Sequence, residues 1–234
     1  MFYYTGDTHG QTLKLQRGVD LYGMTEDDVV VVMGDAGFNY YGPKSSSDRK
    51  NKRILSTLAP TIFCIHGNHE MRPHHIPSYE IKEWHGGKVY VEEKYPKLLF
   101  AIDGEIYDFN GLKTIVIGGA YSVDKYYRLQ RGVSWFEDEQ PNDEIKAKVE
   151  SALEGCGWKI DQVLSHTCPA KYTPTEAFLP GLDQSTVDRS TEEWLDSIED
   201  RLTYSCWMCG HWHIDKTVDK LMFLMNDFVF REGR

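Results

Sequence analysis

Unbroken apolar runs alternate with glycine-containing polar loops in the first 70 residues of the chain. Residues 29–33 and 62–65 are apolar without a break, and the second run is expected to form a strand over 61–65; such runs are typical of strands covered on both faces of a sheet. A shorter apolar run, residues 2–4, precedes them. The stretch up to about residue 22 and residues 49–58 are expected to be helical. Strand, loop and helix in repetition predict βαβ units around a covered sheet.

The rest of the chain mixes short strands with two more helices. Strands are expected over 98–102, 105–109 and 113–117, and Asn110-Gly111 between the last two is a strong signal for a two-residue hairpin turn. Helices are expected over 142–153 and 191–202, with Thr191 as the N-cap of the second. Further strands are expected at 162–164 and 205–209, and a closing hairpin over 216–230. The longest expected loops, 42–48 and 169–190, are candidates for function because long loops in compact domains often carry it.

Polar side chains with metal-binding chemistry follow five of the expected strands. In open α/β sheets ligands bind at the carboxyl ends of the strands, so these loops can converge on one site. Imidazole, carboxylate and carboxamide form a nitrogen and oxygen ligand set for borderline divalent metals. Residues two apart in extended chain point the same way. The residues are Asp7 and His9, then Asp35, then Asn68 and His69, then His166, then His211 and His213.

The number of donors favours two metal ions over one. A single catalytic zinc takes about three protein ligands, and these residues without His69 already offer seven candidate donors. Two ions about 3.5–4 Å apart, bridged by a carboxylate and a water, would use them all. Two divalent ions beside the carboxylates of Asp7 and Asp35 leave a positive surplus, which suits a phosphate.

Composition narrows the class of protein. The chain has 234 residues, and 26 Lys and Arg against 36 Asp and Glu give a formal net charge of −10. This size predicts a single domain over residues 1–234. The acidic charge disfavours general nucleic-acid binding. The chain lacks an apolar run of about 18 residues and a signal-peptide start, so we expect no membrane association and a cytoplasmic location. The five scattered cysteines are expected to be reduced thiols.

Taken in order, the polar blocks resemble those of the calcineurin-like metallophosphoesterase superfamily. That resemblance implies a four-layer α/β/β/α sandwich of two mixed β-sheets flanked by helices. It runs from residue 6 to residue 213 and includes each expected metal-binding motif. The blocks are Gly6-Asp7-Thr8-His9, Gly34-Asp35, Gly67-Asn68-His69-Glu70, Ser165-His166 and Gly210-His211-Trp212-His213.

The resemblance also implies a role for each residue. Asp7, His9 and His213 would hold one metal ion, Asn68, His166 and His211 would hold the other, and Asp35 would bridge both. His69 would protonate the leaving oxygen or stabilise the transition state, and Glu70 would orient a ligand from behind. A metal-bridging hydroxide would attack phosphorus in line. Manganese is the favoured metal, and iron, zinc or nickel remain open.

The second block departs from the protein serine/threonine phosphatase branch of the family. That branch continues with Asp and Arg at the positions occupied here by Phe38 and Asn39. The Arg that grips a phosphomonoester dianion is therefore missing at that position, and other residues must grip the substrate. The candidates for this role are Asn39, Tyr40, Arg72, Tyr121 and Arg128.

The expected substrate follows from this departure. A phosphodiester or nucleotide is favoured, so the partner would be a small phosphate ester, a nucleotide or a short nucleic acid. One alternative is a phosphomonoesterase or a protein serine/threonine phosphatase. A metal-dependent nuclease for small or single-stranded targets is another. An alternative of a different class is a catalytically silent scaffold, which would be expected to have replaced ligand positions; each ligand position here keeps a coordinating residue.

Overall fold

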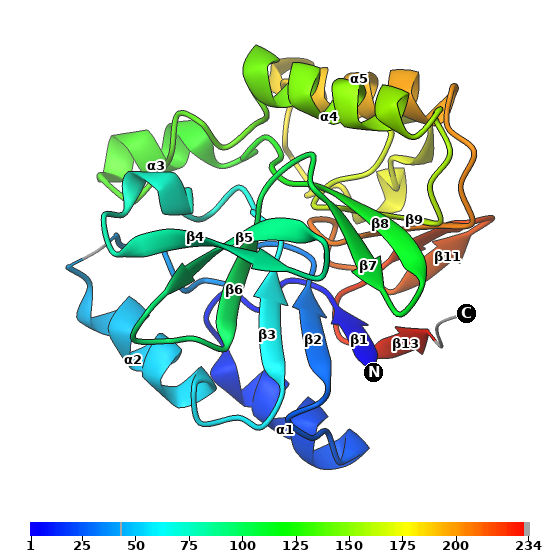
Figure 1. Cartoon of the computed structure of the whole chain (residues 1–234). Coiled ribbons are helices and arrows are strands. Elements are labelled where there is room, and N and C mark those ends of the chain that lie inside the picture. The colour runs from blue at the N-terminus through cyan, green and yellow to red at the C-terminus, as the bar shows by residue number, and fades with distance from the viewer. Residues whose placement is uncertain (43, 232–234) are drawn as a thin grey trace.

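Two β-sheets lie face to face, and helices cover the outer face of each (Figure 1). The computed structural model describes residues 1–42 and 44–231. The layers follow one another as helix, sheet, sheet and helix, so the expected four-layer α/β/β/α sandwich is confirmed. Within the described ranges, the helices are too short or too polar to cross a lipid bilayer.

Seven described strands form the first sheet, in the order β13-β1-β2-β3-β6-β5-β4. The four central strands, β1, β2, β3 and β6, are parallel to one another; β13 and β5 pair antiparallel with the strands beside them, and β4 pairs antiparallel with β5. The bounds are β1 (Phe2–Thr5), β2 (Val29–Val32), β3 (Thr61–Cys64), β4 (Tyr79–Trp84), β5 (Gly87–Glu92), β6 (Leu98–Ala101) and β13 (Val229–Arg231).

The second sheet has six described strands, in the order β11-β12-β10-β9-β8-β7. Its central strands are again parallel, with an antiparallel pair at each edge. The bounds are β7 (Ile106–Phe109), β8 (Leu112–Ile117), β9 (Gln162–Ser165), β10 (Cys206–Cys209), β11 (Lys216–Val218) and β12 (Leu221–Phe223). Asn110 and Gly111 both have positive φ, 54° and 84°, so the expected hairpin turn is confirmed.

Two helices cover each sheet. α1 (Thr12–Tyr22) and α2 (Ser46–Leu55) pack on the first sheet, and α4 (Asp143–Gly155) and α5 (Ser190–Glu199) pack on the second. The short helix α3 (Lys125–Arg131) follows β8. Single turns of 3₁₀ helix occur in the connections, as η1 (Pro73–His75), η2 (Ala170–Tyr172), η3 (Thr175–Ala177) and η4 (Gln184–Thr186).

The unbroken valine run of β2 is explained by its position between two cores. Val30 packs in the cluster beneath α1 and α2, whereas Val31 packs in the cluster between the sheets. Successive side chains of a strand point to opposite faces, so a strand covered on both faces must be apolar at each position. A third cluster, around Trp207, joins the second sheet to α4 and α5.

Several element boundaries differ from the expectations. α2 begins at Ser46 because the Ser45 side chain caps it by accepting the Asp48 amide at 3.0 Å. The N-cap prediction for Thr191 was wrong: α5 begins at Ser190, and the Thr191 hydroxyl donates to Gln140 Oε1 at 2.7 Å. All five cysteines are free thiols, as expected.

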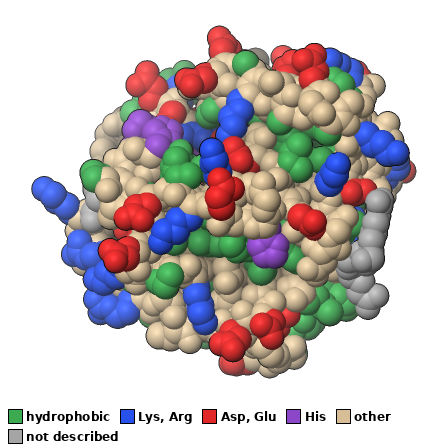
Figure 2. All heavy atoms as spheres, in the orientation of Figure 1, with side chains coloured by type: hydrophobic (Ala, Val, Ile, Leu, Met, Phe, Trp, Pro, Cys, Tyr) green, Lys and Arg blue, Asp and Glu red, His purple; other side chains and the backbone are tan. Residues whose placement is uncertain are grey.

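The expected hairpin over 216–230 is only half correct. β11 and β12 do form a hairpin, but β13 leaves that sheet and pairs antiparallel with β1 in the first sheet. The β4–β5 hairpin and α3 had not been expected. Charged side chains are interspersed over the face shown in Figure 2, and Lys and Arg gather over α2, where Arg49, Lys50 and Arg53 are exposed.

A buried hydrogen bond joins the two sheets, and this generates a stability prediction. The Tyr4 hydroxyl of β1 donates to Gln162 Oε1 of β9 at 3.2 Å, and the Thr114 hydroxyl donates to the same oxygen at 3.0 Å. We expect Tyr4→Phe to lower the free energy of unfolding by about 1 kcal/mol, measured in urea. Tyr3→Phe is the matched control, because Tyr3 packs on the other face of the sheet. Equal losses for both variants would contradict the assignment.

Candidate metal centre

All seven candidate ligands come together where five strands end. Parallel strands of both sheets direct their carboxyl ends to this edge, and each following loop turns its polar side chains into the same space. Asp7 and His9 follow β1, Asp35 follows β2, Asn68 follows β3, His166 follows β9, and His211 and His213 follow β10.

One group of donors consists of Asp7, His9 and His213, whose ligand atoms lie within 4.8 Å of one another. His9 Nε2 and His213 Nε2 face each other at 2.9 Å. Asp7 Oδ2 lies 3.2 Å from His213 Nε2 and 3.8 Å from His9 Nε2. The other Asp7 oxygen, Oδ1, accepts the backbone amide of His211 at 3.0 Å, which ties the first block to the last.

The second group of donors is centred on the Asn68 carboxamide. Asn68 Oδ1 lies 2.8 Å from His166 Nε2 and 3.1 Å from His211 Nδ1. The His166 side chain is buried, and desolvation together with the neighbouring His166 lowers the pKa of His211 well below its usual value. A neutral imidazole is the form that binds a metal ion.

Asp35 lies between the two groups. Its Oδ2 is 3.8 Å from His9 Nδ1, and its Oδ1 is 3.8 Å from His166 Nε2. Asp35 Oδ1 also accepts the backbone amide of His69 at 2.8 Å. The ligand atoms of Asp7, Asp35 and His166 form a further cluster within 4.8 Å, so the two groups adjoin.

The donor set fits a divalent cation because two hydrogen-bond acceptors, one on His166 and one on Asn68, face each other with no proton between them. His166 Nδ1 lies 2.8 Å from the Met33 carbonyl oxygen, which can only accept a hydrogen bond, so the proton of a neutral imidazole is on Nδ1. Asn68 Nδ2 donates to the Ser122 hydroxyl oxygen at 2.8 Å, which directs Oδ1 to the histidine. The His166 Nε2 lone pair and Asn68 Oδ1 are therefore two acceptors 2.8 Å apart, which a cation would satisfy.

The carboxylate of Asp7 is also suited to a cation. Oδ2 is buried and makes no hydrogen bond of good geometry within the described residues. Burial acts to raise the pKa of Asp7, but its interactions with His213, His166 and His9 outweigh that effect and lower it. The contact with Asp7 in turn raises the pKa of His213. An ionised, buried carboxylate facing imidazole nitrogens is suited to metal binding.

Backbone strain is concentrated in the ligand loops. Outside glycine, eight described residues have positive φ, and four of them are candidate ligands. Such conformations cost of order 1 kcal/mol or more each and persist where the surrounding structure enforces them, most often at functional sites. The four are His9 (46°), Asp35 (47°), His211 (63°) and His213 (54°).

Two motif glycines leave room for ligands from other blocks. A Cβ on Gly67 would lie 2.0 Å from Asp35 Oδ1, and a Cβ on Gly34 would lie 2.0 Å from His166 Nδ1. Both distances are far inside van der Waals contact. Both glycines are therefore required by close approach between loops, and Gly34 also by its positive φ of 102°.

His69 and Glu70 lie beside the donors. His69 Nε2 is 4.0 Å from Asp35 Oδ2 and 3.3 Å from Asn68 Nδ2. Burial lowers the pKa of His69, and Arg128 reinforces that effect while Asp35 opposes it. Glu70 is fully buried and accepts the Gly67 amide at 3.1 Å, so it supports the third ligand loop from behind. Burial and the Asp35 charge raise the pKa of Glu70 to about 8.

Lys14 of α1 was not predicted to belong to this site. Its ammonium donates to the carbonyl oxygens of Gly6 and Asp7, each at 3.0 Å, and to that of Met225. Burial lowers its pKa to about 8. Lys14 thus fixes the first ligand loop. A lysine seven residues after Asp7 on a helix gives no recognisable motif.

Ser122 and Glu139 support Asn68. The Ser122 hydroxyl oxygen accepts from Asn68, and the Ser122 amide donates to Glu139 Oε1 at 3.0 Å. Glu139 is buried, and burial raises its pKa. The chain Glu139–Ser122–Asn68 therefore fixes which end of the Asn68 carboxamide faces His166.

Two cavities open onto the donors and share the side chains of Asp35 and His69. The first has a volume of about 470 Å³ and extends toward the connection between β9 and α5. The second, of about 430 Å³, extends toward α2 and α3, with Tyr40, Tyr41 and Arg128 in its wall.

Three of the substrate-grip candidates lie at these cavities. Tyr121 lines the first cavity, and Tyr40 and Arg128 line the second. The Arg128 guanidinium donates from Nη1 to the Tyr40 hydroxyl oxygen at 2.7 Å and from Nε to both oxygens of Asp124 at 2.7 Å. Its Nη2 is 3.4 Å from His69 Nε2.

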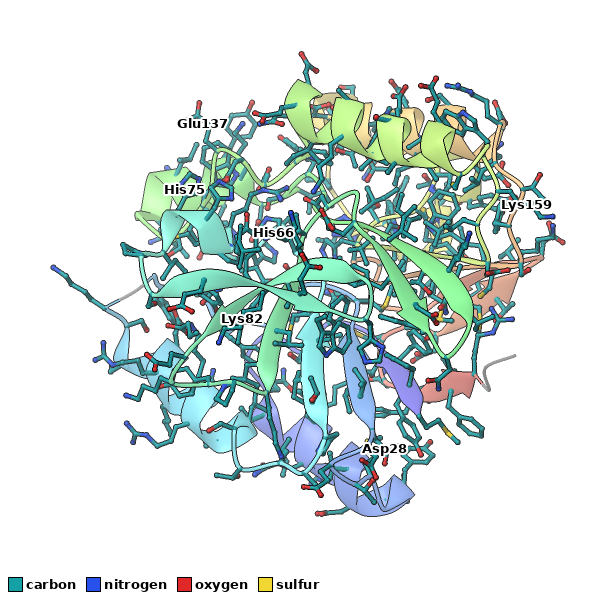
Figure 3. All side chains as sticks on the ribbon, viewed as in Figure 1. Asp28, His66, His75, Lys82, Glu137 and Lys159 are labelled. Carbon is teal, nitrogen blue, oxygen red and sulfur yellow. The ribbon has the colours of Figure 1, made fainter. Side chains whose placement is uncertain are left out.

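The other two candidates are buried in structural contacts. The Asn39 carboxamide pairs with the Tyr79 hydroxyl at 3.1 and 3.2 Å. Arg72 donates from Nη1 to Asp103 Oδ2 at 2.6 Å and from Nε to the Asp138 carbonyl oxygen at 2.9 Å. His75 Nε2 lies 3.0 Å from Asp138 Oδ2, and Figure 3 shows His75 and the neighbouring Glu137 at the upper left of the molecule. Neither Asn39 nor Arg72 lines the two cavities.

Comparison with known proteins identifies the class. The family model of calcineurin-like phosphoesterases matches residues 1–215. This chain therefore belongs to the calcineurin-like phosphoesterase family, which normally binds divalent metals, and whose activity is metal-dependent hydrolysis of phosphate esters, although some members are inactive.

Among the solved structures with a similar fold is one that covers nearly all of this chain. It is the crystal structure of TT1561 of Thermus thermophilus, with a TM-score of 0.52 and 14% sequence identity. The similarity covers 96% of this chain and 87% of that one, and it shows a shared fold. Among curated proteins, no sequence matches this chain.

The support of Asn68 by Ser122 generates a prediction about metal affinity. We expect Ser122→Ala to weaken Mn²⁺ binding by about 10-fold or more, because the carboxamide loses the contact that orients it. Titration calorimetry on the metal-free protein measures this without turnover. Ser197→Ala on α5 is the matched control, since the Ser197 hydroxyl donates only to the Trp194 carbonyl oxygen. Equal Mn²⁺ affinities for the two variants would show that Ser122 does not orient Asn68 for metal binding.

Proposed function

We propose that this protein hydrolyses phosphodiesters with the help of two divalent metal ions. The observation that supports a diester is the pair of cavities that meet at Asp35 and His69. A diester carries two organic groups on one phosphate, and a phosphate beside Asp35 would direct one group into each cavity. A monoester carries a single group and would leave one cavity without an occupant.

Two sets of three donors support a pair of ions. Asp7, His9 and His213 would hold one, and a set centred on the Asn68 carboxamide would hold the other. Asp35, between the sets, would contact both. When bound, the ions supply positive charge to the phosphate oxygens and make the attacking water more acidic. Manganese remains the favoured metal, with iron, zinc or nickel open.

His69 is the group proposed to assist departure of the leaving oxygen. It lines both cavities, so either organic group of a diester would have its ester oxygen near the ring. Burial lowers the pKa of the ring, and Nδ1 is buried, so Nε2 is the nitrogen that faces the candidate ligands. A hydrogen bond from a proton on Nε2 to the ester oxygen would stabilise the negative charge that develops as the P–O bond breaks.

Arg128 is proposed to replace the missing Arg of the second block. It comes from α3, and its Nη2 is within 3.4 Å of His69 Nε2. The contact of Arg128 Nε with both oxygens of Asp124 holds the guanidinium in place and offsets part of its charge. A partly neutralised Arg suits the single negative charge of a diester better than the dianion of a monoester. Ser47 and Asn51 of α2 line the same cavity.

The first experiment compares two chromogenic esters with Mn²⁺ present. We expect kcat/KM for bis-p-nitrophenyl phosphate to exceed that for p-nitrophenyl phosphate, and Asp35→Asn to lower it by about 100-fold or more. His69→Ala should reduce kcat by about 100-fold. A preference for the monoester would overturn the diester assignment. Turnover of neither ester, with metal bound, would favour the binding scaffold.

A second prediction separates the two arginines. Arg72→Ala should lower the free energy of unfolding by about 3–5 kcal/mol, because it leaves Asp103 as an unpaired buried charge. Its kcat/KM should change little at a temperature where the variant is folded. Arg128→Ala should lower kcat/KM for the diester by about 10-fold or more, since a charged hydrogen bond to phosphate is lost.

Urea unfolding and steady-state kinetics on both variants test this contrast. Each arginine is the control for the other. The reverse pattern, a loss of activity in Arg72→Ala and a loss of stability alone in Arg128→Ala, would mean that the phosphate is gripped from the Arg72 side.

A further inference from the structure

The two cavities beside the donors differ sharply in chemistry. The second has tyrosine hydroxyls, Ser47, Asn51 and Arg128 in its wall. The first has a group of apolar side chains in its wall. They come from the connection between β9 and α5 and from the residues around His213. They are Phe178, Leu179, Leu182, Val187, Trp212 and Ile214.

Two aromatic rings give the first cavity a shape suited to a flat group. Phe178 and Trp212 lie with ring centroids 6.1 Å apart and planes inclined by 31°. Both rings are partly exposed, and Leu179 is 60% exposed. Phe178, Leu179 and Leu182 belong to none of the three core clusters. These side chains therefore have apolar surface that an occupant can remove from water.

Charge around the first cavity disfavours a second anionic group there. The carboxylates of Asp124 and Glu192 line it, and Arg189 is the one cation among its described lining residues. A polyphosphate or a sugar–phosphate chain would meet both acidic groups and gain little from the apolar wall.

We propose that the first cavity is the binding site for an aromatic ring carried by one ester group of the substrate. The natural substrate is then an asymmetric phosphodiester, with an aromatic group in the first cavity and a polar group in the second. This rests on the proposed function and adds to it the chemical class of one substituent. The occupant is a part of the substrate because Asp35, His69 and His211 line the same cavity. An aromatic ring is favoured over a flexible alkyl chain because planar groups stack on Phe178 and Trp212.

Non-hydrolysable phosphonates test the site without turnover. Phenylphosphonate and methylphosphonate share the anionic group and differ in the ring. We expect the Mn²⁺-loaded protein to bind phenylphosphonate about 10-fold more tightly or better, since the ring buries apolar area that a methyl group cannot. Calorimetry gives both dissociation constants, and cyclohexylphosphonate, a non-aromatic ring compound, should bind more weakly than the phenyl compound.

Variants of the apolar wall locate the preference. In Phe178→Ala the ratio of the two dissociation constants should fall by about threefold or more, and Leu182→Ser should act in the same direction. Tyr41→Ala, in the wall of the second cavity and 63% exposed, is the matched control and should keep the ratio. A ratio near one in the unsubstituted protein, or one unchanged by both wall variants, would overturn the proposal.

Hydrolysis of bis-p-nitrophenyl phosphate by the same preparations separates the two proposals. Diester turnover with equal phosphonate affinities would leave the proposed function intact and refute the aromatic site. A strong phenyl preference with no turnover of either ester would establish the aromatic site and refute the proposed function.

Discussion

Two hydrogen-bond acceptors, on His166 and Asn68, face each other in the candidate metal centre, and much of the surrounding structure holds them in this position. His166 Nε2 and Asn68 Oδ1 meet at 2.8 Å, with their other atoms committed to Met33 and Ser122. Without a cation such an arrangement is repulsive, so it must be enforced from outside. The surrounding structure imposes left-handed backbone on four candidate ligands, and glycines leave room for candidate ligands from neighbouring loops. Stability given up at this edge is compensated by the three apolar clusters, whose strands end at the site.

The central architecture could be predicted because its signal is strong and local. A strand between two cores, such as β2, must be apolar throughout, and that run is legible in the sequence. The β4–β5 hairpin could not be predicted in this way. β4 is an edge strand with four exposed residues between two half-buried aromatics, Tyr79 and Trp84. Its pairing depends on β5, which the sequence of β4 does not encode. β13 was missed for a similar reason, since its partner β1 is more than 220 residues away.

Part of the candidate site could likewise be predicted from the sequence, namely the position of its donors. Its ligands stand in short motifs directly after the strands, so strand order alone brings them together. The residues that hold the ligands in orientation are different. Lys14 and Glu139 reach the site only through tertiary packing, and each has the sequence context of an ordinary surface residue. Arg72 and Asn39 illustrate the converse. Both stand close to motifs in the sequence, yet their side chains turn to Asp103 and Tyr79.

The wall of the first cavity is built from a different kind of segment than the metal donors are. Its apolar residues from Phe178 to Val187 lie in a connection with only single turns of 3₁₀ helix, outside both sheets and outside the core clusters. Replacement, lengthening or shortening of that connection would leave strand pairing and donor geometry in place. Within such a fold, chemistry is inherited with the sheets, whereas substrate choice can diverge through one loop, so relatives that share every donor need not share a substrate.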